Sequence, residues 1–456
     1  MLTNFLEHTG CPEEIVRPLV ERVRATSKTQ HGPAEARANG SPLGGNFSAF
    51  SPAEILEALE RPSNTDREPI QRLSAFDDAI RVLRLEQYVH NSTSSIDPSA
   101  RKSLVRQIYY WLRPLFPVAF RKYLQRIALR DWGSIPFPNW PVDCTTEKLM
   151  DAVWQGLLES ETEEELPFIW FWPEGKSSCC IMTHDVETAV GRDFCKTMME
   201  MERRHGITSA FEVVPEERYE VSERYLQELR DGDCEVCLHG LNHDGHLFNS
   251  EAVFLERVGK INAYAKNWGA VGFRSPVMYR NLAWLHAFEF SYDMSVPNVA
   301  HLDPQRGGCC TVMPYFIGDI LELPLTTTQD YSLFHILQQP SLDLWKQQVA
   351  MIRERNGLIS FIIHPDYVNE KWSSDLYDGL LGYLAELRAQ HGVWMALPKE
   401  VDAWWRARRK MRLVREGGDW RISGPRAEQA RVAYASLKEG KVVYRVESSK
   451  AVAGVA

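Results

Sequence analysis

Short apolar runs alternate with helical stretches from about residue 177 to residue 400 of this chain. Strands separated by helices in this way require parallel pairing with right-handed crossovers. Seven or eight such units in roughly 230 residues fit a distorted (β/α) barrel better than an open sheet. The predicted strands are 179–184, 208–214, 234–239, 271–274, 290–295, 320–325, 358–364 and 393–398, and the predicted helices include 221–230, 251–268, 281–288, 341–355 and 374–390.

The regions on either side of this α/β pattern differ from it. Residues 1–130 are predicted to form a mainly helical N-terminal region, with a flexible segment rich in Gly, Ser, Pro and Ala at 27–52. Residues 131–176 are a connecting segment, and the barrel is assigned to 177–412. The strand-like pieces DWRIS, RVAYAS and KVVYRVE predict a small C-terminal β appendage over 413–456.

Charge and composition narrow the possible functions. Lys and Arg number 52 against 61 Asp and Glu, for a formal net charge of −9. This balance does not suit a general nucleic-acid binder, whose domains are usually basic. No stretch approaches the roughly 18 consecutive apolar residues of a membrane-spanning helix. Because the N-terminus also lacks the basic start and apolar run of a secretory signal, we expect a cytoplasmic protein without a transmembrane segment.

One segment departs from the acidic average. Residues 101–130 carry eight Lys and Arg, no Asp or Glu, and several aromatic residues. Such a segment could make peripheral contact with an anionic membrane surface. The interpretation we favour is a pair of helices that pack their aromatic side chains inward, because Pro114 and Pro117 interrupt any single long amphipathic helix.

Ionisable residues gather at the ends of the predicted strands, where the active site of a barrel lies. Five different strands end in a residue that can carry out acid–base chemistry or bind a metal ion, and such a number is hard to explain by chance. In chain order these residues are Asp185 with Glu187, His239, Arg274, Asp293 and His364.

Two histidines and two carboxylates in this part of the chain have the spacing of a metal site. His239 and His243, within HGLNH, can present ring nitrogens to one divalent cation. Asp185 and Glu187 lie two residues apart, so in extended backbone they share a face. One carboxylate can complete the metal site while the other acts as a base. A simpler role for either carboxylate is to cap the following helix. His246, three residues beyond His243, is expected to be a solvated loop residue.

Five short motifs together resemble a known family. THDVE (183–187), HGLNH (239–243), RSP (274–276), the Asp-x-Ser of YDMSV and IIH (362–364) are similar, in this order, to the motifs of the NodB-type polysaccharide deacetylases. The resemblance covers roughly residues 177–400. It implies a deformed (β/α) barrel that removes an N-acetyl group from an amino sugar with the help of a divalent metal ion, for which Zn²⁺ is the expectation.

The resemblance also implies roles for individual residues. Asp185 would be the base and His364 the general acid, and His239 and His243 would be metal ligands. Arg274 would hold the base carboxylate, and Asp293 would orient and charge the acid histidine. These pairings are reasonable, since a carboxylate beside Arg stays ionised and a histidine beside Asp stays protonated.

The chain departs from the family pattern at two positions. Val186 occupies the place of the usual metal-binding Asp, so that Glu187 would take this role, although Asp185 could equally bind the metal and leave Glu187 as the base. Val277 replaces the aromatic residue that usually follows the R-x-P motif, and its N–H could still assist an oxyanion.

The prediction is therefore a metal-dependent hydrolase acting on an N-acetylated amino sugar. A nucleotide-linked or lipid-linked precursor suits the expected location better than a cell-wall polymer. Two alternatives remain at this point. One is a non-catalytic carbohydrate-binding protein, which Val186 favours, and the other is a hydrolase of a non-sugar or cyclic amide on the same barrel.

Overall fold

The computed structural model describes residues 2–18, 69–91, 126–159 and 164–447, together with Glu21 and Leu124. The predicted flexible segment 27–52 and most of the basic segment 101–130 lie outside these residues. Within the described part of the chain, no helix is both long and apolar enough to cross a membrane.

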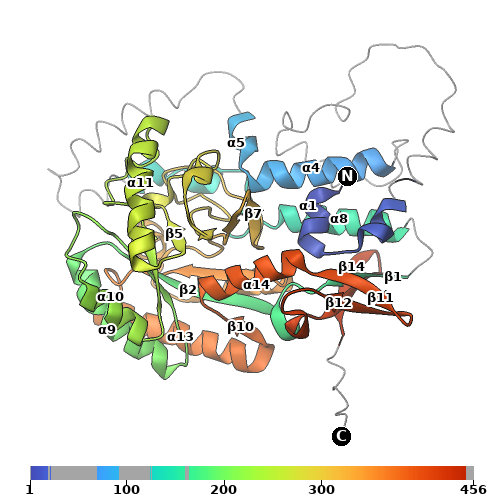
Figure 1. The fold of residues 1–456 in the computed structure, drawn as a ribbon. Coiled ribbons are helices and arrows are strands. Elements are labelled where there is room, and N and C mark those ends of the chain that lie inside the picture. The colour runs from blue at the N-terminus through green and yellow to red at the C-terminus, as the bar shows by residue number, and fades with distance from the viewer. Residues whose placement is uncertain are drawn as a thin grey trace, which may run out of the picture.

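A mainly parallel, curled sheet forms the centre of the molecule (Figure 1). The strand order is β10-β2-β3-β4-β5-β6-β8-β7, and β9 pairs with β2 as well. All pairs are parallel except β7 with β8. The bounds are β2 (Ser178–Val186), β3 (Ala210–Val213), β4 (Glu235–His239), β5 (Gly272–Arg274), β6 (Tyr292–Asp293), β7 (Tyr315–Ile317), β8 (Ile320–Glu322), β9 (Leu358–Ile362) and β10 (Val393–Met395).

The burial of strand β2 shows that the sheet is covered on both faces. All nine of its residues are buried, as expected for a parallel strand that is packed on each side. Its first half pairs with β9 and β10, and its last four residues pair with β3. The end of β2 therefore lies inside the sheet, where β3 pairs with it and β9 reaches as far as Thr183.

Threonine hydrogen bonds join the two sides of the curled sheet. Beyond β8, Thr326 Oγ1 donates to the carbonyl of Leu358 (2.8 Å), and the N–H of Thr327 donates to the carbonyl of Ser360 (3.3 Å). These bonds connect the β8 side to β9, although no regular ladder forms there. All eight predicted strands are present, which confirms the curled parallel architecture, and the antiparallel strand β7 was not predicted.

The helices that follow the strands along the chain pack around the sheet (Figure 1). Serine and threonine caps begin several of them, as at Thr188 before α9, Ser222 before α10 and Ser250 before α11. The predicted helix over 281–288 is wrong, since this stretch contains only the 3₁₀ turn Leu285–Ala287. The bounds are α9 (Ala189–Arg204), α10 (Glu223–Asp231), α11 (Glu251–Trp268), α12 (Asp343–Glu354), α13 (Lys371–His391) and α14 (Pro398–Lys410).

Elements from the two ends of the chain pack together beside the sheet (Figure 1). Strand β13 (Val432–Lys438) pairs with both β1 (Glu165–Ile169) and β14 (Lys441–Val446), so residues before and after the main sheet share one smaller sheet. The remaining strands β11 (Arg412–Glu416) and β12 (Asp419–Ser423) form a hairpin. The described N-terminal helices are α1 (Thr3–Thr9), α4 (Pro69–Arg84), α5 (Gln87–Asn91) and α8 (Thr145–Glu159).

Candidate active site

The carboxyl edge of the sheet brings together most of the ionisable residues that the sequence singled out. Asp185 is the penultimate residue of β2, and Glu187 follows that strand. His239 is the last residue of β4 and Arg274 the last of β5, while His364 lies two residues beyond β9. Parallel strands end at the same edge of a sheet, which is why residues up to 179 positions apart can face one another there.

Strand alternation places the two carboxylates on one face. His364 Nε2 lies 4.0 Å from Asp185 Oδ2 and 3.7 Å from Glu187 Oε1, so both side chains reach the same space. Val186, between them, is fully buried in an apolar cluster with Cys195 and Phe211. A carboxylate at position 186 would therefore point away from the site, and the carboxylate at position 187 reaches it instead.

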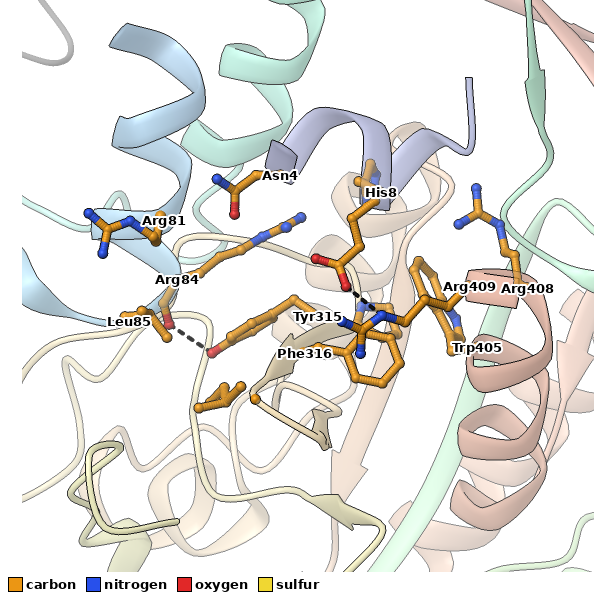
Figure 2. Close-up of a pocket in the computed structure, with 14 residues that line it drawn as sticks. Asn4, His8, Arg81, Arg84, Leu85, Tyr315, Phe316, Trp405, Arg408 and Arg409 are labelled. Atoms are coloured by element: carbon orange, nitrogen blue, oxygen red, sulfur yellow. Dashed lines mark hydrogen bonds and ion pairs between the residues drawn. The ribbon is translucent and has the colours of Figure 1, made fainter. Parts of the chain in front are cut away.

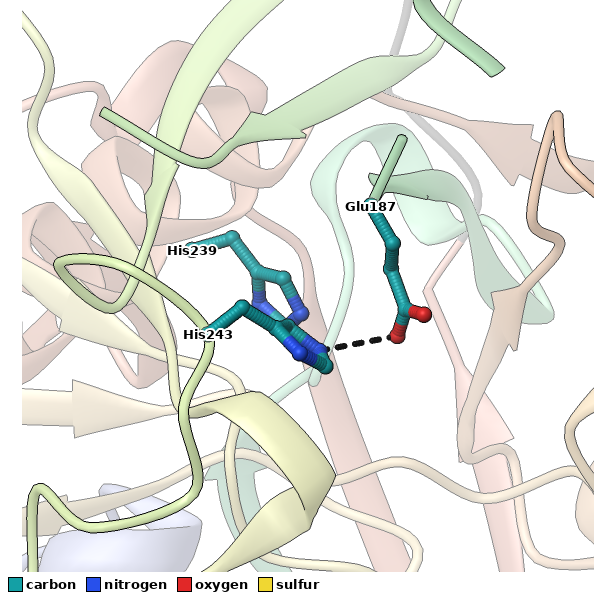
Figure 3. A group of neighbouring side chains, drawn as sticks. All are labelled: Glu187, His239 and His243. Carbon is teal, nitrogen blue, oxygen red and sulfur yellow. Dashed lines mark ion pairs between the residues drawn. The ribbon is translucent and has the colours of Figure 1, made fainter. Parts of the chain in front are cut away.

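Three side chains have the arrangement of a metal site (Figure 3). Each of Glu187, His239 and His243 offers a ligand atom, and these atoms lie within 4.8 Å of one another. Glu187 Oε1 is 2.9 Å from His243 Nε2. Two histidines and one carboxylate form a donor set suited to a divalent transition metal, with coordination positions left for other ligands.

The protonation state of His239 fits a ligand. Its Nδ1 lies 3.1 Å from the carbonyl oxygen of Arg274, which can only accept, so Nδ1 carries the hydrogen. The lone pair is then on Nε2, a buried atom that has no hydrogen-bond partner among the described residues. Burial lowers the pKa of His239 to about 4, so the ring is neutral near pH 7. A second hydrogen bond of this kind commonly orients metal-binding histidines.

Asp185 is held as an ionised carboxylate. Burial by itself raises the pKa of this group, but the neighbouring histidines and Arg274 outweigh burial and lower it. Arg274 Nη1 donates to Asp185 Oδ1 over 2.7 Å. The other oxygen, Oδ2, lies 3.6 Å from His239 Nε2 and thus faces the candidate metal ligands. An ionised carboxylate in this position can accept a proton from a water molecule.

Glu212 is a buried neighbour of this pair that sequence analysis did not find. It lies on β3, where its Oε2 is 3.3 Å from Arg274 Nη1 and accepts the N–H of His184 (2.9 Å). Burial raises the pKa of Glu212 well above its usual value, so Asp185 keeps the guanidinium as its counter-ion. A glutamate in the middle of the apolar run AFEVV was the available signal.

His364 is paired with a different carboxylate from the one predicted. Its Nδ1 lies 2.6 Å from Asp330 Oδ1, and its backbone N–H donates to Asp330 Oδ2. Burial opposes a charge on this ring, but Asp330 and the two site carboxylates outweigh burial and raise the pKa of His364 to about 10. Its Nε2–H is therefore available to donate a proton on the side that faces Asp185 and Glu187.

The predicted pairing of Asp293 with His364 is wrong. Asp293 ends β6, which is separated from β9 in the sheet, and its Oδ1 accepts a hydrogen bond from Ser295 (2.6 Å). Glu322 of β8 also contacts it, and burial raises the pKa of both carboxyl groups. Asp330 follows a short irregular stretch after β8, so neither strand periodicity nor a familiar motif pointed to it.

Asp366 positions Glu187, a carboxylate of the candidate metal site, from the loop after β9. Its Oδ2 accepts the backbone N–H of Glu187 over 3.2 Å, and its Oδ1 accepts the hydroxyl of Thr188. These bonds fix the backbone at the point where β2 passes into α9. Asp366 stands two residues after His364 in the sequence, which could have marked it as a second functional position.

Two further predicted residues lie in the loops at the same edge. Val277 has φ 61° in a 3₁₀ turn directly after β5, a conformation that is unusual for a β-branched residue. His243, in the loop after β4, also has positive φ (55°). Unusual backbone of this kind is often found at functional sites. His246 makes a 2.8 Å contact with Asn249 and is not one of the three clustered ligands.

The sheet and its edge define a class of site: a buried group of side chains that could hold a divalent cation, next to an ionised carboxylate and a charged histidine. No family model matches the chain, and no curated protein matches it. Solved structures that are similar to it include a polysaccharide deacetylase candidate from Mycobacterium smegmatis, with 18% identity and a TM-score of 0.41 over 52% of this chain and 93% of that one.

Two other similar structures have lower identity. PuuE allantoinase is 11% identical, with a TM-score of 0.41 over 52% of this chain and 92% of that one. Peptidoglycan deacetylase PdaC from Bacillus subtilis is 12% identical, with a TM-score of 0.32 over 50% of this chain and 90% of that one. The chain is thus similar to polysaccharide deacetylases over about half its length.

Proposed function

We propose that this protein is a metal-dependent hydrolase that removes the N-acetyl group from an amino sugar. The observation that carries the proposal is that Asp185 and His364 both lie next to the Glu187–His239–His243 cluster, with Asp185 Oδ2 3.6 Å from His239 Nε2 and His364 Nε2 3.7 Å from Glu187 Oε1. Amide hydrolysis needs a base, an acid and a metal site close together.

Each residue of the site would have a separate role in the reaction. Glu187, His239 and His243 would hold the cation, which we expect to be Zn²⁺. When bound, a divalent cation supplies a Lewis acid that polarises the acyl oxygen and makes water more acidic. Asp185 Oδ2 takes the proton of the attacking water, while Arg274 holds Oδ1 in place.

His364 would complete the proton transfers. Its Nε2–H gives a proton to the departing amine nitrogen as the C–N bond breaks, and Asp330 keeps the ring oriented and charged. The products are acetate and a free amine, so water supplies both the hydroxyl and the proton that are needed. Val277, in the turn after β5, would present its N–H to the developing oxyanion.

Ring surfaces beside His364 support a sugar as the substrate class. Tyr367 lies 5.0 Å from the ring of His364, and the rings of Tyr331 and His335 lie 5.4 and 5.3 Å from Tyr367. All three side chains are partly exposed, and this aromatic group next to His364 is the feature from which we propose a sugar as the substrate class. We propose a nucleotide-linked or lipid-linked amino sugar as the form of the substrate.

Matched carboxylate variants test this assignment. Glu187→Gln should lose both bound metal and acetate release, because a neutral amide is a poor ligand for a divalent cation. Asp185→Asn should retain metal and lose turnover by about 10²-fold or more, because only the proton acceptor is removed. Glu220→Gln, at an exposed position, is the control and should match the wild type.

The substrate panel separates the remaining alternatives. Acetate would be measured from N-acetylglucosamine and UDP-N-acetylglucosamine, and ring opening from hydantoin as a cyclic amide. Acetate release from the sugars supports the proposal. Ring opening alone would mean that the substrate is a cyclic amide. If metal is retained but no substrate is turned over, the protein is a non-catalytic carbohydrate-binding protein.

A further inference from the structure

A second cavity lies at the opposite end of the sheet from the candidate active site. It is lined by α1, α4, the β7 hairpin and the last turns of α14, and its volume is about 190 Å³ (Figure 2). Strand β7 pairs with β8 so that Ile317 faces Ile320, the first residue of β8, which places this hairpin at the amino edge of the sheet. The candidate catalytic residues lie at the carboxyl edge.

Four arginines line this cavity against a single carboxylate. Helix α4 contributes Arg81 and Arg84, three residues apart on one face, and α14 contributes Arg408 and Arg409. Glu7 of α1 forms an ion pair with Arg409 (2.7 Å). The excess of positive charge is unexpected in a chain whose formal net charge is −9.

Arg84 is the feature that most directly indicates a ligand. Its side chain extends from α4 into the space between Asn4 and the ring of Tyr315 (Figure 2). The residue is only 7% exposed, and its Nε and Nη2 have no hydrogen-bond partner among the described residues. Burial lowers the pKa of Arg84, and the charge of Glu147 opposes this shift only in part. A buried guanidinium without a paired anion is unfavourable, and a bound anion would remove this cost.

Other donors around the cavity lack partners as well. Trp405, 3% exposed, has an indole Nε1 without a hydrogen-bond partner in the described structure, and His8, 6% exposed, has an unpartnered Nδ1. Burial lowers the pKa of His8 well below its usual value, so this ring is neutral and can either donate or accept a hydrogen bond. Arg408 is different, because it donates to the carbonyls of Ile169 and Trp170 and thus closes one wall.

The chemistry and size of the cavity favour a compact anion. A guanidinium fork matches the oxygens of a phosphate group, and several guanidinium groups together favour a dianion over a single carboxylate. A cavity of about 190 Å³ has room for a phosphate group. We propose that this arginine-lined cavity binds a phosphate group, carried either by a small molecule or by a lipid headgroup.

Titration with inorganic phosphate at low ionic strength tests this proposal, with binding followed by calorimetry. We expect saturable binding at one site. Arg84→Met should weaken it by about tenfold or more, because the variant removes a charge-assisted hydrogen-bond donor from a buried position. Arg224→Ala, a matched loss of charge on the exposed face of α10, should leave it unchanged. If Arg84→Met does not fold, the exposed Arg81→Ala should weaken binding by about twofold or more.

Further arms identify the source of the phosphate and separate this site from the active site. Binding of glucose 6-phosphate indicates a small molecule, and sedimentation with phosphatidic acid vesicles, but not with phosphatidylcholine vesicles, indicates a lipid headgroup. His243→Ala should not change phosphate binding, whatever it does to acetate release. The proposal is overturned if no saturable binding occurs in any arm, if Arg84→Met and Arg224→Ala bind equally well, or if His243→Ala abolishes binding while Arg84→Met keeps it.

Discussion

Single residues decide the chemistry at the edge of this sheet, and Asp330 is the clearest example. Its two oxygens bind both the ring Nδ1 and the backbone N–H of His364. The ring is thereby oriented as well as charged, and its Nε2–H faces Asp185 and Glu187. A proton donor for a departing amine needs both properties.

Asp330→Asn should lower turnover by about 10²-fold or more, because His364 loses the carboxylate that orients and charges it. The measurement is the initial rate of acetate release at saturating substrate, with circular dichroism as a check on folding. Asp293→Asn is the matched control, since Asp293 contacts Ser295 and Glu322 instead. Equal rates for the two variants would remove Asp330 from the mechanism.

The sequence predicted the site residues that end strands but not those that lie in loops. Asp185, His239 and Arg274 were predictable because strand ends in a parallel sheet converge at one edge. Asp330 and Asp366 come from irregular stretches, whose course depends on tertiary packing. Glu212 could be read as a polar residue in an apolar strand, but its proximity to Arg274 required knowledge of which strands are neighbours.

At the scale of elements, the start of α9 links helix packing to the candidate metal site. Gly191 lies in the first turn of α9, and a Cβ added there would stand 2.7 Å from Asp366 Cγ. Asp366 in turn accepts the backbone N–H of Glu187. A side chain at position 191 must therefore displace the group that positions a metal-site carboxylate.

Gly191→Ala should lower both metal content and stability for this reason, although alanine is the better helix former. Gly259→Ala in α11 is the matched control, because an added Cβ meets nothing within 4 Å there. This control should stabilise the protein by about 0.5–1 kcal/mol. Denaturant midpoints and metal analysis of both variants check the prediction, and a stabilised Gly191→Ala with full metal content would contradict it.

The elements themselves were largely predictable. Eight strands and most helices of the main sheet follow from apolar periodicity, since each parallel strand is a short buried run between helices. The stretch 281–288 has helical spacing but forms only a short 3₁₀ turn. Strands β1 and β7 were missed because their antiparallel pairing partners are determined by the tertiary fold.

At the scale of the whole molecule, buried carboxyl groups make stability depend on pH. Glu235 is 4% exposed and accepts hydrogen bonds from Tyr292 Oη (2.8 Å) and the N–H of Lys399 (3.0 Å). Burial raises the pKa of Glu235 from the usual 4.5 to about 7. Between these two values the folded protein binds more protons than the unfolded chain, so this group's contribution to stability falls as pH rises.

Glu235→Gln should therefore gain stability relative to the wild type as pH rises from about 5 to about 8, by an amount on the order of 1–3 kcal/mol. Glutamine resembles the protonated carboxyl group and does not ionise. The free energies of unfolding of both proteins would be measured by denaturant titration at several pH values. A difference that stays constant with pH would mean that Glu235 does not titrate in this range.

If Glu187, His239 and His243 hold a divalent metal ion, the purified protein should contain it, and metal analysis measures this. We expect roughly one zinc ion per chain in the wild type and in His246→Ala. His243→Ala should lose at least about 10–100-fold in metal affinity, because the removal of a ligand should exceed the usual effect of changing a residue that only supports one. If His243→Ala and His246→Ala contain equal amounts of metal, these three residues do not form a metal site.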